Sequence, residues 1–124
     1  TVLSRGLGDV YKRQPFHCEL MREATIKMDK IINDQNIVTP NYKIISNVTA
    51  KEYQSTEEIK NLLVKQIESP VRWRESIEFM IFSGTNTFVE IGPGKVLSSL
   101  IKRINKDVKV LNIDTLEDIQ GINL

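Results

Sequence analysis

The chain alternates between stretches whose apolar residues recur every three to four positions and short runs that are rich in β-branched and aromatic residues. The first spacing is typical of one face of an amphipathic helix, whereas short apolar runs between glycine or polar residues are typical of strands. The sequence therefore predicts helices over about 19–33, 55–67, 69–83 and 96–104, strands over 42–46, 87–91 and 108–113, and a short helix from Leu116.

Each long predicted helix has an apolar stripe that we expect to face a core. In chain order, the four stripes are Leu20, Met21, Ala24, Met28, Ile31 and Ile32; Ile59, Leu62, Leu63 and Ile67; Trp73, Ile77, Met80 and Ile81; and Val96, Leu97, Leu100, Ile101 and Ile104. Ser55 and Glu58 have the spacing of a capping box. Pro70 suits the first position of a helix, and Gly84 suits a C-terminal stop.

Strands and helices that alternate along a chain are typical of an α/β domain, in which helices cover a mostly parallel sheet. The predicted connections between strands contain helices, as parallel crossovers require. Three strands make only a narrow sheet. We therefore expect an α/β fold with mostly parallel strands and covering helices.

Composition narrows the classes of function. The 124 residues include 17 lysines and arginines against 16 aspartates and glutamates, so no net field points to nucleic acid or a membrane surface. No apolar run is long enough to span a bilayer. The single cysteine, Cys18, excludes an internal disulfide and fits a reducing compartment, and one histidine cannot build a multi-histidine zinc site. Cys18 lies beside His17, which could suggest a Cys-His nucleophile pair, but adjacent residues on a helix do not share a face. We therefore expect Cys18 to be a buried spectator.

Three runs carry the functional signal: PFHCELM at 15–21, SPVRW at 69–73 and FVEIGPGKVL at 88–97. In this order and spacing they resemble the C-terminal third of the malonyl-CoA:acyl carrier protein transacylases, the acyltransferases that load malonyl units for fatty-acid synthesis. The resemblance implies that residues 15–124 are the C-terminal part of an α/β-hydrolase-like large subdomain. The family's nucleophile strand and its small ferredoxin-like subdomain would lie outside this chain.

The resemblance assigns the catalytic base to His17, the only histidine. In the family a serine attacks the malonyl thioester, and the histidine takes the serine proton and later returns it to the leaving thiol. A backbone carbonyl orients that histidine, and counting back from Pro70 places the carbonyl on Gln66. Phe16, directly before the histidine, resembles the malonyl-selective members. The serine elbow Gly-x-Ser-x-Gly is absent from this sequence, so we expect the chain alone to be inactive.

The same resemblance implies malonyl-CoA and phosphopantetheinylated acyl carrier protein as substrates, no other cofactor, a cytoplasmic location and a monomeric parent. It implies that Lys102 and Arg103 help to dock the acidic carrier protein. Placed near the end of a predicted helix, the two cations equally fit an interaction with the helix dipole and solvent. Gly92-Pro93-Gly94 could cradle a phosphate, but proline removes a donor, so a structural turn is the preferred interpretation.

Residues 1–14 read TVLSRGLGDVYKRQ and have no strong apolar periodicity. They resemble translated sequencing-adapter read-through, and the family resemblance begins abruptly at Pro15. We therefore expect a non-native or disordered tail at 1–14, although a genuine flexible arm is an alternative.

Two other functions remain open from sequence. Acyltransferase domains of polyketide and multifunctional fatty-acid synthases share the histidine and Gly-Pro-Gly motifs, although the chain ends soon after its last predicted strand, which favours a stand-alone enzyme. A non-catalytic α/β module that binds anions at the Gly-Pro-Gly helix is the alternative from another class.

Overall fold

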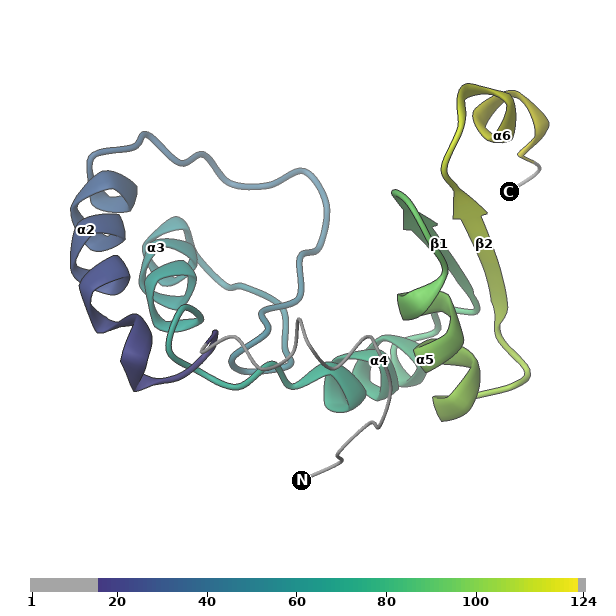
Figure 1. The fold of residues 1–124 in the computed structure, drawn as a ribbon, viewed down its shortest axis with the longest axis horizontal. Coiled ribbons are helices and arrows are strands. Elements are labelled where there is room, and N and C mark those ends of the chain that lie inside the picture. Colours follow the sequence, from purple (N-terminus) through teal and green to yellow (C-terminus); the bar gives the residue numbers. More distant parts are fainter. Residues whose placement is uncertain (1–15, 123–124) are drawn as a thin grey trace. The chain divides into compact units, whose positions relative to one another are not determined.

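The computed structural model describes residues 16–122, and these residues fall into two compact units, 16–73 and 74–122. Figure 1 labels the helices and strands of both units. The tail expected at 1–14 lies outside the described residues.

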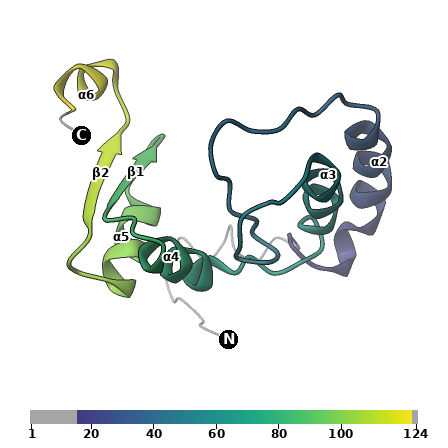
Figure 2. The ribbon, with the colours of Figure 1, turned by 180° about the vertical axis from the view of Figure 1, so that it is seen from behind.

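The first unit is built on two helices that lie side by side in both views (Figures 1 and 2). A 3₁₀ turn, η1 (Glu19–Met21), leads into α2 (Arg22–Asn33), and a long loop leads to α3 (Thr56–Lys65). The predicted first helix is therefore confirmed. The apolar stripe predicted for α2 contains no buried residue. In α3, Ile59 is buried.

The strand predicted at 42–46 is wrong. Ile45 forms only an isolated antiparallel bridge with Glu52. Ser46 N–H donates to the carbonyl of Lys51, and Tyr53 N–H donates to the carbonyl of Ile44. The chain thus folds back on itself directly after Ile45, so this apolar run pairs with its own neighbour and adds no strand to a parallel sheet.

The start of α3 follows the predicted capping box with one change. Ser55 Oγ accepts a hydrogen bond from the N–H of Glu58 at 3.1 Å, as expected. The Glu58 carboxylate accepts from the N–H of Gln54 at 2.6 Å, one residue earlier than the box predicts. The helix ends at Lys65, so Ile67 of the predicted stripe lies beyond it.

The helix predicted to open at Ser69-Pro70 begins three residues later, as α4 (Trp73–Phe82). Ser69 Oγ donates to the carbonyl of Lys65 and so serves the end of α3 instead of the start of α4. The backbone N–H of Arg72 donates to the carbonyl of Asn47 at 3.0 Å. Pro70 therefore lies in a connection that these bonds hold outside the helix.

Gly84 ends α4, as predicted. Its φ of +99° lies in the left-handed region, which glycine adopts without strain. The N–H of Gly84 donates to the carbonyl of Ile81, and the N–H of Thr85 donates to the carbonyl of Met80, both at 3.0 Å. These two bonds form a Schellman motif and satisfy carbonyls that the helix end leaves open.

The second unit contains a parallel two-stranded sheet. Strand β1 (Thr87–Ile91) pairs with β2 (Lys109–Ile113), with Thr87 opposite Lys109 and Ile91 opposite Ile113. Helix α5 (Val96–Ile104) forms the crossover and packs on both strands, and α6 (Leu116–Gly121) follows β2 (Figure 1). The α/β class is confirmed, with two strands in the described residues where the sequence predicted three.

The buried apolar residues of this sheet and its crossover are Phe88, Ile101 and Val108. The stripe predicted for α5 is wrong at its first turn, where Val96 is 66% and Leu97 42% exposed. Ser98 and Ile101 are the buried positions instead. The first turn of α5 is oriented by hydrogen bonds to the Glu90 carboxylate, which place Ser98 and not Val96 or Leu97 toward the sheet.

Ile77 and Phe82 provide a matched test of packing on α4, because they are 1% and 91% exposed. Ile77→Ala should lower the free energy of unfolding by about 2–5 kcal/mol, since it leaves a cavity in a filled interior. Phe82→Ala should change it by less than about 0.5 kcal/mol. Urea denaturation followed by far-UV circular dichroism measures both. Equal losses in the two variants would contradict this packing.

Candidate functional site

His17 lies directly before η1 in an unusual backbone conformation. Its φ is +57°, in the left-handed region that few residues other than glycine adopt, although histidine is among the more tolerant. Cys18 is extended and caps η1, with its carbonyl accepting from the N–H of Met21 at 3.0 Å. The chain thus bends at His17. Strained residues of this kind cluster at functional sites.

The imidazole of His17 contacts a residue far away in sequence. Nδ1 lies 2.8 Å from the backbone oxygen of Gln66. A carbonyl oxygen can only accept, so Nδ1 must carry the proton and the neutral ring keeps its lone pair on Nε2. The His17–Gln66 contact expected from the family resemblance is therefore present, and the exposed imidazole has the tautomer that a general base needs.

Gln66 supplies this carbonyl because it is the C-cap of α3, with its own N–H bonded to the carbonyl of Leu62. The last carbonyls of a helix have no partner within the helix. Gln66 therefore offers His17 an oxygen that the helix does not use.

Cys18 differs from its predicted state. We expected a buried thiol, but Cys18 is half-buried. The elements that follow it, η1 and α2, also contain no buried residue.

The Gly92-Pro93-Gly94 turn joins β1 to α5. Gly92 has φ +127° and Gly94 has φ +90°, so both positions require glycine. The N–H groups of Leu97 and Ser98, in the first turn of α5, donate to the Glu90 carboxylate at 3.1 and 2.8 Å. Two donors of the first turn are thus already bonded to a carboxylate that lies where an anion would bind. This favours the structural interpretation of the turn over the anion-binding alternative.

Glu90 is the centre of a polar network that the sequence analysis missed. The Ser98 hydroxyl and the Asn112 side-chain amide also donate to its carboxylate, at 2.5 and 3.0 Å. Hydrogen bonds from the Ser98 side chain, then from the backbone amides and Asn112, outweigh desolvation and hold the pKa of Glu90 below its ordinary value. The available signal was a charged residue among the apolar residues of a strand, eight positions before a serine.

The expected carrier-protein residues differ in their contacts. Lys102 Nζ donates to the carbonyls of Lys106 and Val108, at 3.0 and 2.6 Å, and so stabilises the connection from α5 to β2. Arg103 is exposed, and it has no hydrogen bond or ion pair within residues 16–122. Of the two residues, Arg103 therefore presents the charge that is not committed to the described fold.

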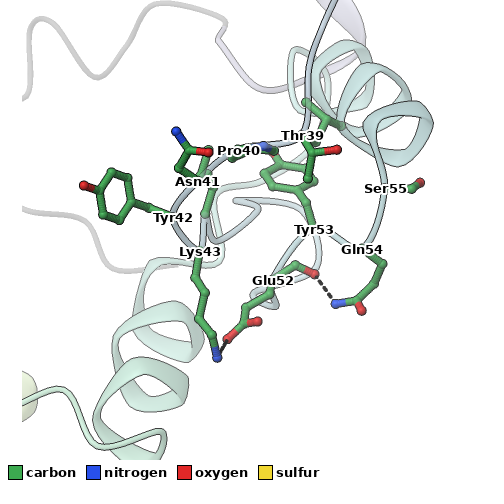
Figure 3. Close-up of a pocket in the computed structure, with 11 residues that line it drawn as sticks. Thr39, Pro40, Asn41, Tyr42, Lys43, Glu52, Tyr53, Gln54 and Ser55 are labelled. Atoms are coloured by element: carbon green, nitrogen blue, oxygen red, sulfur yellow. Dashed lines mark hydrogen bonds and ion pairs between the residues drawn. The ribbon is translucent and has the colours of Figure 1, made fainter.

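A separate depression of about 240 Å³ is lined by the loop at 39–44, by 52–55 and by Ile59 (Figure 3). Lys43 and Glu52 form an ion pair at 2.9 Å on its rim. None of the residues that line it belongs to the His17–Gln66 pair. Residues 16–122 contain no cluster of acidic, histidine and cysteine side chains able to hold a metal ion, and none of their helices could cross a bilayer.

Comparison with known proteins gives consistent results. No protein-family profile matches the chain. It is 44% identical over 109 residues to a malonyl CoA-acyl carrier protein transacylase of Staphylococcus aureus, an alignment that covers 88% of this chain and 35% of that protein. A Bacillus subtilis protein of the same name is 42% identical over 106 residues, which are 86% of this chain and 33% of the relative. The chain thus spans about a third of the length of these relatives.

Solved structures agree. The acyl-carrier-protein-S-malonyltransferase of Bartonella henselae matches with a TM-score of 0.82 and 43% identity, over 86% of this chain and 34% of that one. A malonyl-transacylase solved in complex with its type II polyketide synthase acyl-carrier protein matches with a TM-score of 0.79 and 37% identity, over 86% and 35%. The sequence resemblance is confirmed.

The Glu90 network predicts a specific pH dependence. Because the folded-state pKa of Glu90 is lowered, its stabilising contribution is complete above its ordinary value of 4.5 and is lost as pH falls through the lower folded-state value. Glu90→Gln should therefore be less stable than the parent chain at neutral pH, and the difference should shrink on acidification below 4.5. Thermal unfolding across pH measures it.

The control is Glu57→Gln, in the exposed first turn of α3. This variant should show a smaller change with pH than Glu90→Gln does. A Glu90→Gln variant whose deficit stays constant from neutral to acidic pH would show that the network does not act through the carboxylate charge.

Proposed function

The chain is homologous to malonyl CoA-acyl carrier protein transacylases over about a third of their length. We propose that it is part of an enzyme that transfers malonyl groups from coenzyme A to acyl carrier protein in fatty-acid synthesis. The observation that carries the proposal is the His17–Gln66 bond of 2.8 Å, because it gives the only histidine the tautomer of a general base. The identities of 42–44% with the transacylases support the substrate class.

The proposed reaction has two halves, acylation of a serine and transfer of the malonyl group to the carrier-protein thiol. His17 Nε2 takes the proton of a serine hydroxyl while the serine oxygen bonds to the malonyl carbonyl carbon, and the C–S bond then breaks as the proton passes to the coenzyme A sulfur. In the second half, the carrier-protein thiol gives its proton to His17 and its sulfur attacks the seryl ester. The ester C–O bond then breaks as His17 returns the proton to the serine oxygen. Gln66 O stabilises the imidazolium in both halves.

We propose further that the enzyme needs no cofactor beyond its two substrates and works in the cytoplasm. Arg103 is the better candidate of the basic pair for contact with the acidic carrier protein, because Lys102 is bonded to the backbone. The carrier protein could instead belong to a polyketide synthase, since one similar malonyl-transacylase was solved with such a partner. The anion-binding module is disfavoured because Glu90 occupies the helix N-terminus.

The chain by itself should show no malonyl transfer, because its sequence contains no Gly-x-Ser-x-Gly elbow and removal of a nucleophile removes the covalent route. Incubating the purified chain with radiolabelled malonyl-CoA and carrier protein tests this expectation. Any covalent malonylation of the chain would contradict it.

In the complete parent enzyme, His17→Ala should slow acylation by roughly 100- to 10,000-fold, the scale of general-base catalysis. Gln66→Ala should cause a much smaller loss, because the contact with His17 uses the backbone oxygen. Single-turnover measurement of the malonyl-enzyme compares the two variants. A His17→Ala enzyme with a near-normal rate would end the catalytic interpretation of the motif.

A further inference from the structure

A tight turn at 46–51 lies against the segment that carries the Gln66 carbonyl. Ser46, which is 1% exposed, closes this turn with backbone bonds of 2.9 Å to Lys51 and to Ala50. Its hydroxyl accepts from the N–H groups of Val48 and Thr49 at 3.1 and 3.5 Å. Because so many of its polar groups are paired internally, the turn can act as a fixed support.

Asn47, the second residue of the turn, contacts both ends of the segment 66–72. Its side-chain Nδ2 donates to Gln66 Oε1 at 3.5 Å, a long hydrogen bond, and its backbone oxygen accepts from the N–H of Arg72 at 3.0 Å. The guanidinium of Arg72 also donates to the carbonyl of Thr49 at 3.3 Å. The turn thus holds the connection that follows α3 at its first and last residues.

We propose that Asn47 is a positioning residue, which fixes Gln66 so that its carbonyl meets His17 Nδ1. The side chain of Asn47 acts on His17 only through Gln66, since it bonds to the Gln66 side chain and the Gln66 backbone bonds to the imidazole. The catalytic meaning of this role rests on the proposed function. The structural role does not, because the tautomer of His17 can be measured without substrate.

The chain offers an unambiguous probe, since it contains one histidine. Long-range ¹H–¹⁵N correlation spectra of the ¹⁵N-labelled chain report the ratio of the Nδ1–H to the Nε2–H tautomer at alkaline pH. The parent chain should be dominated by the Nδ1–H form. In Asn47→Ala the ratio should fall by about two- to fivefold, the lower part of the range that one net hydrogen bond accounts for. General destabilisation does not shift this ratio within the folded molecules.

Three further variants sharpen the test. Gln66→Ala removes the same contact, so it should lower the ratio as much as Asn47→Ala, and the double variant should lower it no further. Asn47→Asp should keep a ratio close to that of the parent chain, because the Gln66 amide can turn its Nε2 toward the carboxylate. Asn33→Ala is the control, since its side chain bonds only to Asp29 within the described residues.

The outcomes are decisive. An unchanged tautomer ratio in Asn47→Ala, or an Asn47→Asp variant that behaves like Asn47→Ala, would overturn the positioning role. A parent chain without an excess of the Nδ1–H form would overturn it as well. A complete enzyme that fails to transfer malonyl groups would overturn the proposed function but leave the tautomer result standing, so the two failures are distinguishable.

Discussion

The first unit is organised around a single hydrogen bond between residues 49 positions apart, from His17 Nδ1 to the backbone oxygen of Gln66. This bond needs α3 to stop at Gln66, so that a carbonyl is left without a helical partner. The geometry also includes a bend of the chain at His17, where φ is +57°. The Ser55 cap that starts α3 and the bonds that delay α4 until Trp73 both serve this geometry.

The second unit is organised differently, because several polar groups converge on one carboxylate. Glu90 on β1, Ser98 on α5 and Asn112 on β2 form one network that ties the crossover helix to both strands. Hydrogen bonds to an ionised acceptor are stronger than neutral ones, and chains such as Asn112 to Ser98 to Glu90 polarise one another. The network explains why a turn with two glycines can still hold the start of α5 in one orientation.

Periodicity was sufficient to predict every described helix, because each carries a stripe or a cap that depends only on nearby residues. Gly84 is the clearest example, since its motif closes within five positions. Periodicity failed at Ile45 and Pro70, where long-range or backbone partners decide the conformation. His17 and Gln66 were found through family resemblance. Asn47 and Glu90 were not found, because their roles depend on contacts that no local pattern encodes.

The backbone at His17 has one more consequence. A residue with a side chain in the left-handed region is less favourable than glycine by about 1–2 kcal/mol. Position 17 has that conformation, yet it holds an imidazole. Local folding energy and chemistry thus favour different residues at this one position, a conflict between stability and function. Glycine at position 17 would relax the backbone, but it would remove the imidazole that contacts the Gln66 carbonyl.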